Sequence, residues 1–207
     1  MTFSGVLDDI LGQKSKVRIL RLLLRSHARL TGRQIARQTG LNHGTCHAAL
    51  RDLARHGVVL RSPVGTAHLY QLNEEHVLVK DVLTDAFGCE SDLVEQYAHA
   101  ARKGLRIPVE SVILYGSVAR GEERPDSDVD LMFIVSDLKA AEKGRRLMGP
   151  LAASLARRFG SVPQIVFSDS RSLRIQVKRR NPYFTSVVQD GRVLFGKALS
   201  ELLKNDS

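Results

Sequence analysis

Two aspartates that follow a Gly-Ser pair are the residues of this chain best suited to phosphate chemistry. The apolar segment 112–115 ends at Gly116 and Ser117, and after ten further residues Asp128 and Asp130 open a second apolar segment. Alternate residues of a strand point to the same face, so we expect the two carboxylates to converge. Each motif alone is common turn chemistry. Together they favour a site for a Mg²⁺-bound triphosphate, because Mg²⁺ takes oxygen ligands.

This pattern resembles the nucleotidyltransferases of the DNA polymerase β superfamily, and within it the minimal nucleotidyltransferase branch of bacteria and archaea. The resemblance spans about residues 105–197 and includes Ala119-Arg120-Gly121 and Ser127. It implies that Gly116 and Ser117 hold the phosphates of a nucleoside triphosphate, with ATP the expected one. It also implies that Asp128 and Asp130 are the catalytic metal ligands, for Mg²⁺ or Mn²⁺. Such enzymes transfer a nucleoside monophosphate to an acceptor and release pyrophosphate.

Two residues near this motif leave alternatives open. Arg120 could contact a phosphate, or it could pair with Glu122 or Glu123. Active relatives carry a third carboxylate on the next strand, where this chain has Gln164. A glutamine oxygen is neutral and cannot act as a base, so we expect nucleotide binding with weakened or absent catalysis. Asp169 lies beyond the expected end of that strand and could substitute only if the backbone bends. Whether the chain is an enzyme stays open.

The positive charge of the chain is concentrated in one segment. Residues 14–72 contain eleven Lys or Arg and a single acidic residue, Asp52, whereas the whole chain has a net charge of +9. A segment of this charge density is typical of a protein that binds a polyanion, and we favour nucleic acid over a solvated basic surface.

The same segment has the order of a winged helix-turn-helix domain. We expect helices over 15–26, capped by Ser15, over 31–40, and from Asn42 to His56, followed by strands over 58–62 and 67–72. This order resembles bacterial regulators of the MarR or ArsR type. In the third helix Cys46, Ala49, Leu50 and Leu53 form the buried stripe, and the opposite side would enter the major groove of double-stranded DNA. The candidate DNA-binding residues are Thr31, Asn42, His43, Gly44, Thr45, His47, Arg51, Arg55 and Arg61.

The predicted fold is α+β in two domains. Residues 1–73 form the winged helix domain, and residues 74–104 form a helical connector broken near Gly88. Residues 105–207 form a nucleotidyltransferase-type mixed sheet flanked by helices. Strands are expected over 109–115, 131–135 and 162–167, with one amphipathic helix over 140–159. We expect the helices on one side of this sheet. The connector could build a homodimer or pack on its own domain.

The composition of the chain indicates the cellular compartment in which we expect the protein. No apolar run of the 207 residues has the length of a membrane span, and the first ten residues lack the form of a signal peptide. The two cysteines, Cys46 and Cys89, lie far apart, which disfavours a disulfide framework or a zinc site. His43 and His47 have a spacing that can bind metal, but no carboxylate or Cys supports them. We expect a cytoplasmic protein.

Two functions follow from these patterns. The first is a DNA-binding transcriptional regulator with a C-terminal domain that binds a Mg²⁺-nucleotide with little or no catalysis. The alternative is an active nucleotidyltransferase of toxin–antitoxin type, which modifies a protein, RNA or small molecule and has a protein partner from the same operon. In a third interpretation both domains bind RNA. The basic residues that could line an RNA path are Arg145, Arg146, Arg157, Arg158, Arg174, Lys178, Arg179 and Arg180.

Overall fold

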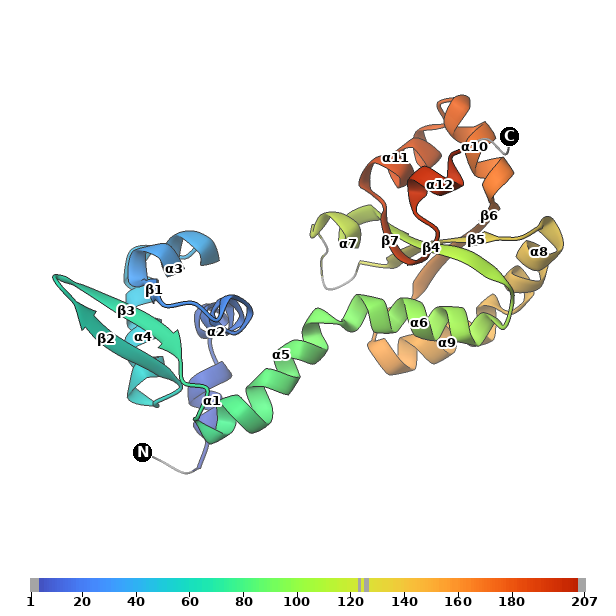
Figure 1. Ribbon diagram of the computed structural model, residues 1–207. Coiled ribbons are helices and arrows are strands. Elements are labelled where there is room, and N and C mark those ends of the chain that lie inside the picture. The colour runs from blue at the N-terminus through green and yellow to red at the C-terminus, as the bar shows by residue number, and fades with distance from the viewer. Residues whose placement is uncertain (1–3, 123, 125–126, 205–207) are drawn as a thin grey trace. The chain divides into compact units, whose positions relative to one another are not determined.

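The chain divides between Ser91 and Asp92 into two units in a computed structural model, which describes residues 4–122, 124 and 127–204. The segment predicted as a connector, residues 74–104, is shared between these units. Its first part belongs to the N-terminal unit and its last helix to the C-terminal unit (Figure 1). Each unit has its own hydrophobic core and is described separately.

The N-terminal unit packs its helices against a small antiparallel sheet with the strand order β1-β3-β2. Ile19, Leu20, Ile35 and Leu50 are among the side chains that form its core. The elements in chain order are α1 (Val6–Leu11), α2 (Lys14–Ser26), β1 (Leu30–Thr31), α3 (Gly32–Thr39), α4 (His43–Arg55), β2 (Val59–Val64), β3 (Ala67–Leu72), the π-helical turn η1 (Val79–Leu83) and α5 (Thr84–Ser91).

Helix ends in this unit follow the local sequence at most positions. Thr31 caps α3 through a reciprocal capping box with Gln34, and the Asn42 side chain accepts the backbone N–H of Thr45 at 2.8 Å to cap α4. Gly40 ends α3 in the left-handed conformation. The predicted cap at Ser15 is wrong, because α2 begins at Lys14 and no side chain caps it.

One buried cation joins α2 to α4. Lys16 is 4% exposed, and its ammonium group pairs with Asp52 and donates to the Asp9 carbonyl. The hydrogen bond from Lys16 is the main cause that holds the pKa of Asp52 below its ordinary value. The one acidic residue of the basic segment is thus paired with a buried lysine of the same unit.

Lys16→Met should therefore destabilise the protein by about 1–3 kcal/mol at pH 7, since it leaves the Asp52 carboxylate without its closest cation. The folded pKa of Asp52 is lowered, so the contribution is present above the unfolded pKa of about 3.9 and is lost as the pH falls below it. Calorimetry of the full chain at pH 7 and pH 3 measures the difference, which should shrink at pH 3. Lys14→Met, near the start of the same helix and exposed, is the matched control; equal effects of the two substitutions would contradict the assigned role of Lys16.

The hairpin that follows α4 is longer than predicted. β2 runs to Val64 and pairs with β3 in register from Val59↔Leu72 to Val64↔Ala67. The turn is reduced to Gly65 and Thr66, and Gly65 has a φ of +56°. The predicted end of the first strand at Ser62 is wrong, because Pro63 continues the extended backbone.

The break in the connector lies at Asp92 and not near Gly88. Gly88 is inside α5, where an added Cβ would meet no atom within 4 Å. Glycine costs a helix only about 1 kcal/mol relative to alanine, so one glycine need not end it. Asp92 leaves the helical conformation and becomes the N-cap residue of α6 (Leu93–Leu105).

The C-terminal unit is built on a four-stranded mixed sheet with the order β6-β5-β4-β7, in which only β5 and β6 are parallel. The remaining elements are β4 (Val109–Tyr115), α7 (Gly116–Arg120), β5 (Val129–Val135), α8 (Leu138–Arg146), α9 (Met148–Phe159), β6 (Pro163–Asp169), α10 (Ser170–Lys178), α11 (Pro182–Asp190), β7 (Arg192–Gly196) and α12 (Leu199–Leu202). This α+β arrangement confirms the predicted fold class.

Helices cover both faces of this sheet, so the prediction that they lie on one side is wrong. Leu131 and Phe133 of β5 pack into a core with α6, α8 and α9, whereas Met132 and Ile134 pack into a second core with α10, α11 and α12 (Figure 1). A strand buried on both faces is apolar at every position. The sequence of residues 131–135 has this form.

The single helix predicted over 140–159 is two helices. α8 ends at Arg146 and α9 begins at Met148. Pro150 explains the break, because a proline has no N–H to donate to the carbonyl four residues earlier and its ring collides with it. Within the described residues, no helix has the length and apolar character needed to cross a bilayer.

Candidate functional site

The Gly-Ser turn and one of the predicted carboxylates are in direct contact. Tyr115, the last residue of β4, pairs across the sheet with Asp130 of β5. Gly116 follows with a φ of +75°, and a Cβ added there would lie 2.2 Å from the Asp130 Oδ2 atom. Only glycine tolerates both this conformation and this approach. The carboxylate therefore lies against the backbone of the turn.

Asp128 and Asp130 form a neighbouring pair of carboxylates. Asp128 is exposed and Asp130 is half-buried. Burial, and then the charge of Asp128, raise the pKa of Asp130 above its ordinary value, while Arg120 acts in the opposite direction. Within the described part of the chain, neither carboxylate has a hydrogen-bond or ion-pair partner. Two adjacent carboxylates with no such partner favour the binding of a cation.

The parallel pairing of β5 with β6 places Gln164 beside Asp130. This is the position where active relatives are expected to carry the third carboxylate, and here it holds an amide. Consistent with that, no group of three His, Cys, Asp or Glu residues that could hold a metal exists among residues 4–122, 124 and 127–204. The side chains present thus fit one cation held by two carboxylates, and they lack the acid that a second cation would use.

Asp169 cannot replace the missing acid. It is the last residue of β6, not a residue past the strand end as predicted, and it pairs with Val135 at the opposite end of β5 from Asp130. Its carboxylate caps α10 by accepting the backbone N–H of Ser172 at 2.8 Å and the Ser172 hydroxyl at 2.6 Å. These bonds hold the pKa of Asp169 below its ordinary value even though burial acts to raise it.

Arg120 forms the predicted ion pair with Glu122 and a second ion pair, with Asp190, that was not predicted. Its guanidinium lies 2.8 Å from Glu122 and 3.5 Å from Asp190, at the end of α11. Glu123, the other predicted partner, lies outside the described residues. The Asp190 pair ties α7 to α11, which gives Arg120 a structural role. Its contact with a nucleotide phosphate stays a prediction.

Three tyrosines interact electrostatically with the carboxylates, and none was among the predicted site residues. The Tyr115 and Tyr183 hydroxyls lie 2.5 Å apart, and both rings are close enough to Asp130 for its charge to raise their pKa values, although burial is the larger cause. The pKa of Tyr97 in α6 is likewise raised, mainly by burial and secondly by the charge of Asp128. Tyr115 directly precedes Gly116, so strand alternation could have identified it. No local signal points to Tyr97 or Tyr183.

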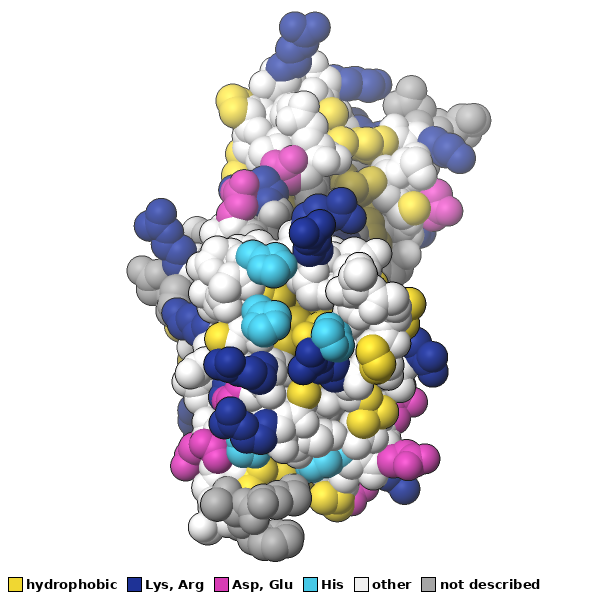
Figure 2. All heavy atoms as spheres, turned by 90° about the vertical axis from the view of Figure 1, so that its left-hand side faces the viewer, with side chains coloured by type: hydrophobic (Ala, Val, Ile, Leu, Met, Phe, Trp, Pro, Cys, Tyr) yellow, Lys and Arg dark blue, Asp and Glu magenta, His cyan; other side chains and the backbone are white. Residues whose placement is uncertain are grey.

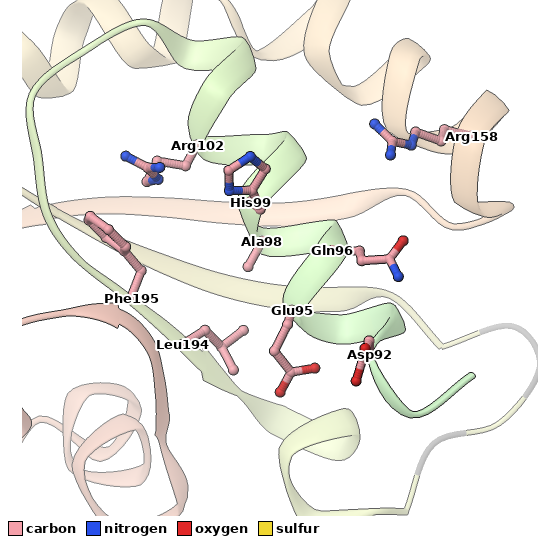
Figure 3. A pocket seen from close by; sticks show the side chains of 9 residues that line it. All are labelled: Asp92, Glu95, Gln96, Ala98, His99, Arg102, Arg158, Leu194 and Phe195. Atoms are coloured by element: carbon pink, nitrogen blue, oxygen red, sulfur yellow. The ribbon is translucent and has the colours of Figure 1, made fainter. Parts of the chain in front are cut away.

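A cavity of about 460 Å³ lies along α6 and is separate from these residues (Figure 3). Its lining combines carboxylates, such as Glu95, with two arginines and an aromatic ring. The guanidinium of Arg102 lies 4.1 Å from the centre of the Phe195 ring. None of the residues predicted to bind nucleotide or metal lines this cavity, so it is not the predicted nucleotide site.

In the N-terminal unit, α4 presents a polar surface opposite its buried stripe. Cys46, Ala49, Leu50 and Leu53 are buried, as predicted. A Cβ at Gly44 would meet only the Asn42 Oδ1 atom, at 3.6 Å, so the fold itself does not require glycine there. A bare backbone at this point permits a close approach from outside. The predicted residues exposed along α4 are His43, Gly44, Thr45, His47, Arg51 and Arg55.

The other predicted residues of this surface have internal partners. Thr31 and Asn42 cap helices, and Arg55 lies 3.4 Å from Asp52. Arg61 of the β2–β3 hairpin lies 2.6 Å from the ring of His68, a residue that was not among those predicted. In Figure 2 Lys, Arg and His side chains gather around a few apolar side chains on this side of the molecule, with acidic side chains at the margins. The surface is suited to a polyanion.

Family comparisons agree with both units. A family model described as "Winged helix-turn-helix DNA-binding" matches residues 13–59, and one described as "Polymerase beta, Nucleotidyltransferase" matches residues 105–198. The chain joins a winged helix-turn-helix domain to a nucleotidyltransferase domain. The predicted resemblance to these two families is thereby confirmed. The winged-helix domain makes DNA binding and transcription regulation the expected role of the N-terminal unit.

Two solved structures each align with part of this chain. A crystal structure of "the toxin-antitoxin with AMP-PNP" is 19% identical over 53% of this chain and 78% of that chain, with a TM-score of 0.36. The NMR structure of a homodimeric winged helix-turn-helix domain from Mycobacterium bovis, from a possible ArsR-family regulator, is 22% identical over 45% of this chain and 85% of that chain, with a TM-score of 0.33. Among the curated proteins no sequence matches.

Proposed function

We propose that this protein is a DNA-binding transcriptional regulator whose nucleotidyltransferase domain binds a Mg²⁺-nucleotide and has weakened or no transferase activity. The observation that supports this most directly is the register of β5 and β6. It pairs Asp130 with Gln164, next to an otherwise intact set of Gly116, Ser117 and Asp128. The domain keeps the groups for holding a nucleotide and lacks the third acid.

The proposed roles in the nucleotide site follow from the contacts. Asp128 and Asp130 would hold the cation, and Mg²⁺, when bound, neutralises phosphate charge and orients the α-phosphate. Gly116 lets the backbone of the turn lie against Asp130. The Ser117 hydroxyl has no hydrogen-bond partner among the described residues, so it is available to a phosphate oxygen. Gln164 cannot accept a proton from an acceptor hydroxyl, which is the step that we propose is impaired.

In the winged-helix domain, we propose that the start of α4 enters the major groove and that the β2–β3 hairpin contacts the backbone beside it. His43, Gly44 and His47 would lie toward base edges. Arg51 is exposed and would reach a phosphate or a guanine. Arg55 and Arg61 would add positive charge from their present positions beside Asp52 and His68.

Arg51→Ala should weaken binding to the cognate DNA about 10-fold, because a lost phosphate or guanine contact costs roughly 1–3 kcal/mol. If the contact is to phosphate, the slope of log affinity against log salt concentration should also become shallower by about one unit, since one fewer counterion is released. Fluorescence anisotropy over a series of salt concentrations measures both. Arg145→Ala, an exposed arginine of α8, removes the same charge outside the winged helix and should leave the affinity unchanged. Equal losses for the two variants would contradict the assigned interface.

A gel shift of the full chain on its own upstream DNA, at stated salt, tests the regulator proposal. Binding should be tight and should weaken steeply with salt. Adding Mg²⁺ and ATP should raise the unfolding temperature through the C-terminal domain. Binding that is absent, or insensitive to salt, would overturn the DNA-binding half of the proposal.

The second candidate is an active nucleotidyltransferase of toxin–antitoxin type, with a protein partner from the same operon and a protein, RNA or small-molecule acceptor. The specific observation in its favour is that the Gly116 turn lies against Asp130 and that Asp128 is close enough to affect the pKa of Asp130. Labelled ATP with Mg²⁺ would then release pyrophosphate that Asp128→Asn with Asp130→Asn abolishes. A cytoplasmic location and a homodimer remain further proposals. Light scattering of the purified chain tests the homodimer.

A further inference from the structure

Helix α6 carries one tyrosine whose hydroxyl is turned into the protein. Tyr97 is 3% exposed, and its ring packs against Phe159 with the ring centres 5.0 Å apart. Its hydroxyl donates to the Ser161 carbonyl at 3.2 Å. Phenylalanine would pack against Phe159 equally well, so ring packing does not explain why this residue carries a hydroxyl.

The contact continues from Ser161 to the segment that carries Asp128. The Ser161 hydroxyl donates to the Ser127 carbonyl at 3.5 Å, and the Val129 N–H donates to the Val162 carbonyl at 3.4 Å. These two links hold the residues on either side of Asp128 against the start of β6. Tyr97 is linked to this segment through Ser161, whose carbonyl accepts the Tyr97 hydroxyl.

The Tyr97 hydroxyl is buried, and its hydrogen-bond partner among the described residues is the Ser161 carbonyl. Burial, and secondly the charge of Asp128, raise the pKa of Tyr97 above its ordinary value. A buried hydroxyl costs free energy unless it is hydrogen-bonded, so its bond to Ser161 offsets a real penalty.

We propose that the Tyr97 hydroxyl is a positioning group of the nucleotide site, which acts through Ser161 and Ser127 to hold Asp128 beside Asp130. This inference rests on the proposed function of the two carboxylates. Tyr97 itself touches neither nucleotide nor metal. Groups behind the metal ligands commonly change metal affinity about 10- to 100-fold when they are removed.

The test is Tyr97→Phe, which keeps the ring against Phe159 and removes only the hydroxyl. The full chain with this substitution should bind Mn²⁺ about 10-fold more weakly in the presence of α,β-methylene-ATP. Electron paramagnetic resonance measures the bound Mn²⁺. Ser161→Ala breaks the next link and should weaken binding in the same direction. The double variant should lose less than the product of the two single losses, because both act on one chain of bonds. Tyr70→Phe, at a buried tyrosine of the N-terminal unit, is the matched control.

The outcomes separate this inference from the proposed function. If the wild type binds no Mn²⁺ with the nucleotide analogue, the proposed function fails, and the inference fails with it. If the wild type binds and both Tyr97→Phe and Ser161→Ala bind equally well, only the inference is overturned. Should Tyr97→Phe fail to fold, Ser161→Ala decides alone: weaker binding supports the inference, and unchanged binding overturns it.

Discussion

Replacing both Asp128 and Asp130 with asparagine is expected to weaken Mg²⁺-nucleotide binding by at least about 100-fold. Asparagine keeps the shape of each side chain and removes the charge with which these residues would hold the cation of a Mg²⁺-nucleotide. Isothermal titration of the full chain with ATP and Mg²⁺ measures the loss. The thermal stabilisation by nucleotide should disappear with it.

Measuring the stability of this double variant without nucleotide checks that any loss of nucleotide binding is not caused by unfolding. The pKa of Asp130 is raised in the folded protein, so charging this carboxylate costs stability as the pH rises above the unfolded value of about 3.9. At neutral pH asparagine removes that cost. Without nucleotide, the variant should therefore unfold at the same temperature as the wild type or at a higher one. Retained nucleotide affinity in a folded double variant would refute the assignment of these carboxylates.

Gln164→Glu is expected to gain function. Glu has nearly the shape of Gln, and the register of β5 and β6 places it beside Asp130, where it restores a third acid. Affinity for a second Mn²⁺ should rise about 10- to 100-fold, by analogy with other changes around metal sites. With water as the acceptor of the nucleoside monophosphate, pyrophosphate release from ATP should rise about 100-fold, the lower end of what a general base contributes.

Gln164→Asn is the matched control, because it changes the side chain and adds no charge. It should leave both metal stoichiometry and pyrophosphate release at the wild-type level. If Gln164→Glu binds no further metal and releases no more pyrophosphate than Gln164→Asn, the missing carboxylate is not what limits this domain. Rapid turnover by the wild-type chain would equally show that the missing carboxylate is not limiting.

The features predicted well from the sequence are those encoded over short stretches. The buried stripe of α4 follows from helical spacing at Cys46, Ala49, Leu50 and Leu53. The capping roles of Thr31 and Asn42 follow from residue type just before a helix. The approach of Gly116 to Asp130 follows from two strands that each end or begin at a polar motif. In each example the deciding partners lie on one element or on adjacent strands.

The features that were missed depend on contacts between distant segments. Tyr183 and Asp190 reach the site from α11, more than fifty residues after Asp130, and no spacing rule connects them. Tyr97 reaches it from α6 through the loop before β6. The helices on both faces could have been predicted, because residues 131–135 are apolar without alternation. The break before α9 could also have been predicted, from Pro150.

We expect this nucleotidyltransferase domain to bind a nucleotide without efficient turnover. The most direct test is one titration of the wild-type chain with ATP and Mg²⁺ in which bound nucleotide and released pyrophosphate are measured together. We predict saturable binding that depends on Mg²⁺, with pyrophosphate release no faster than from the Asp128→Asn, Asp130→Asn variant. Rapid release that requires both aspartates would contradict the claim and establish the chain as an active transferase.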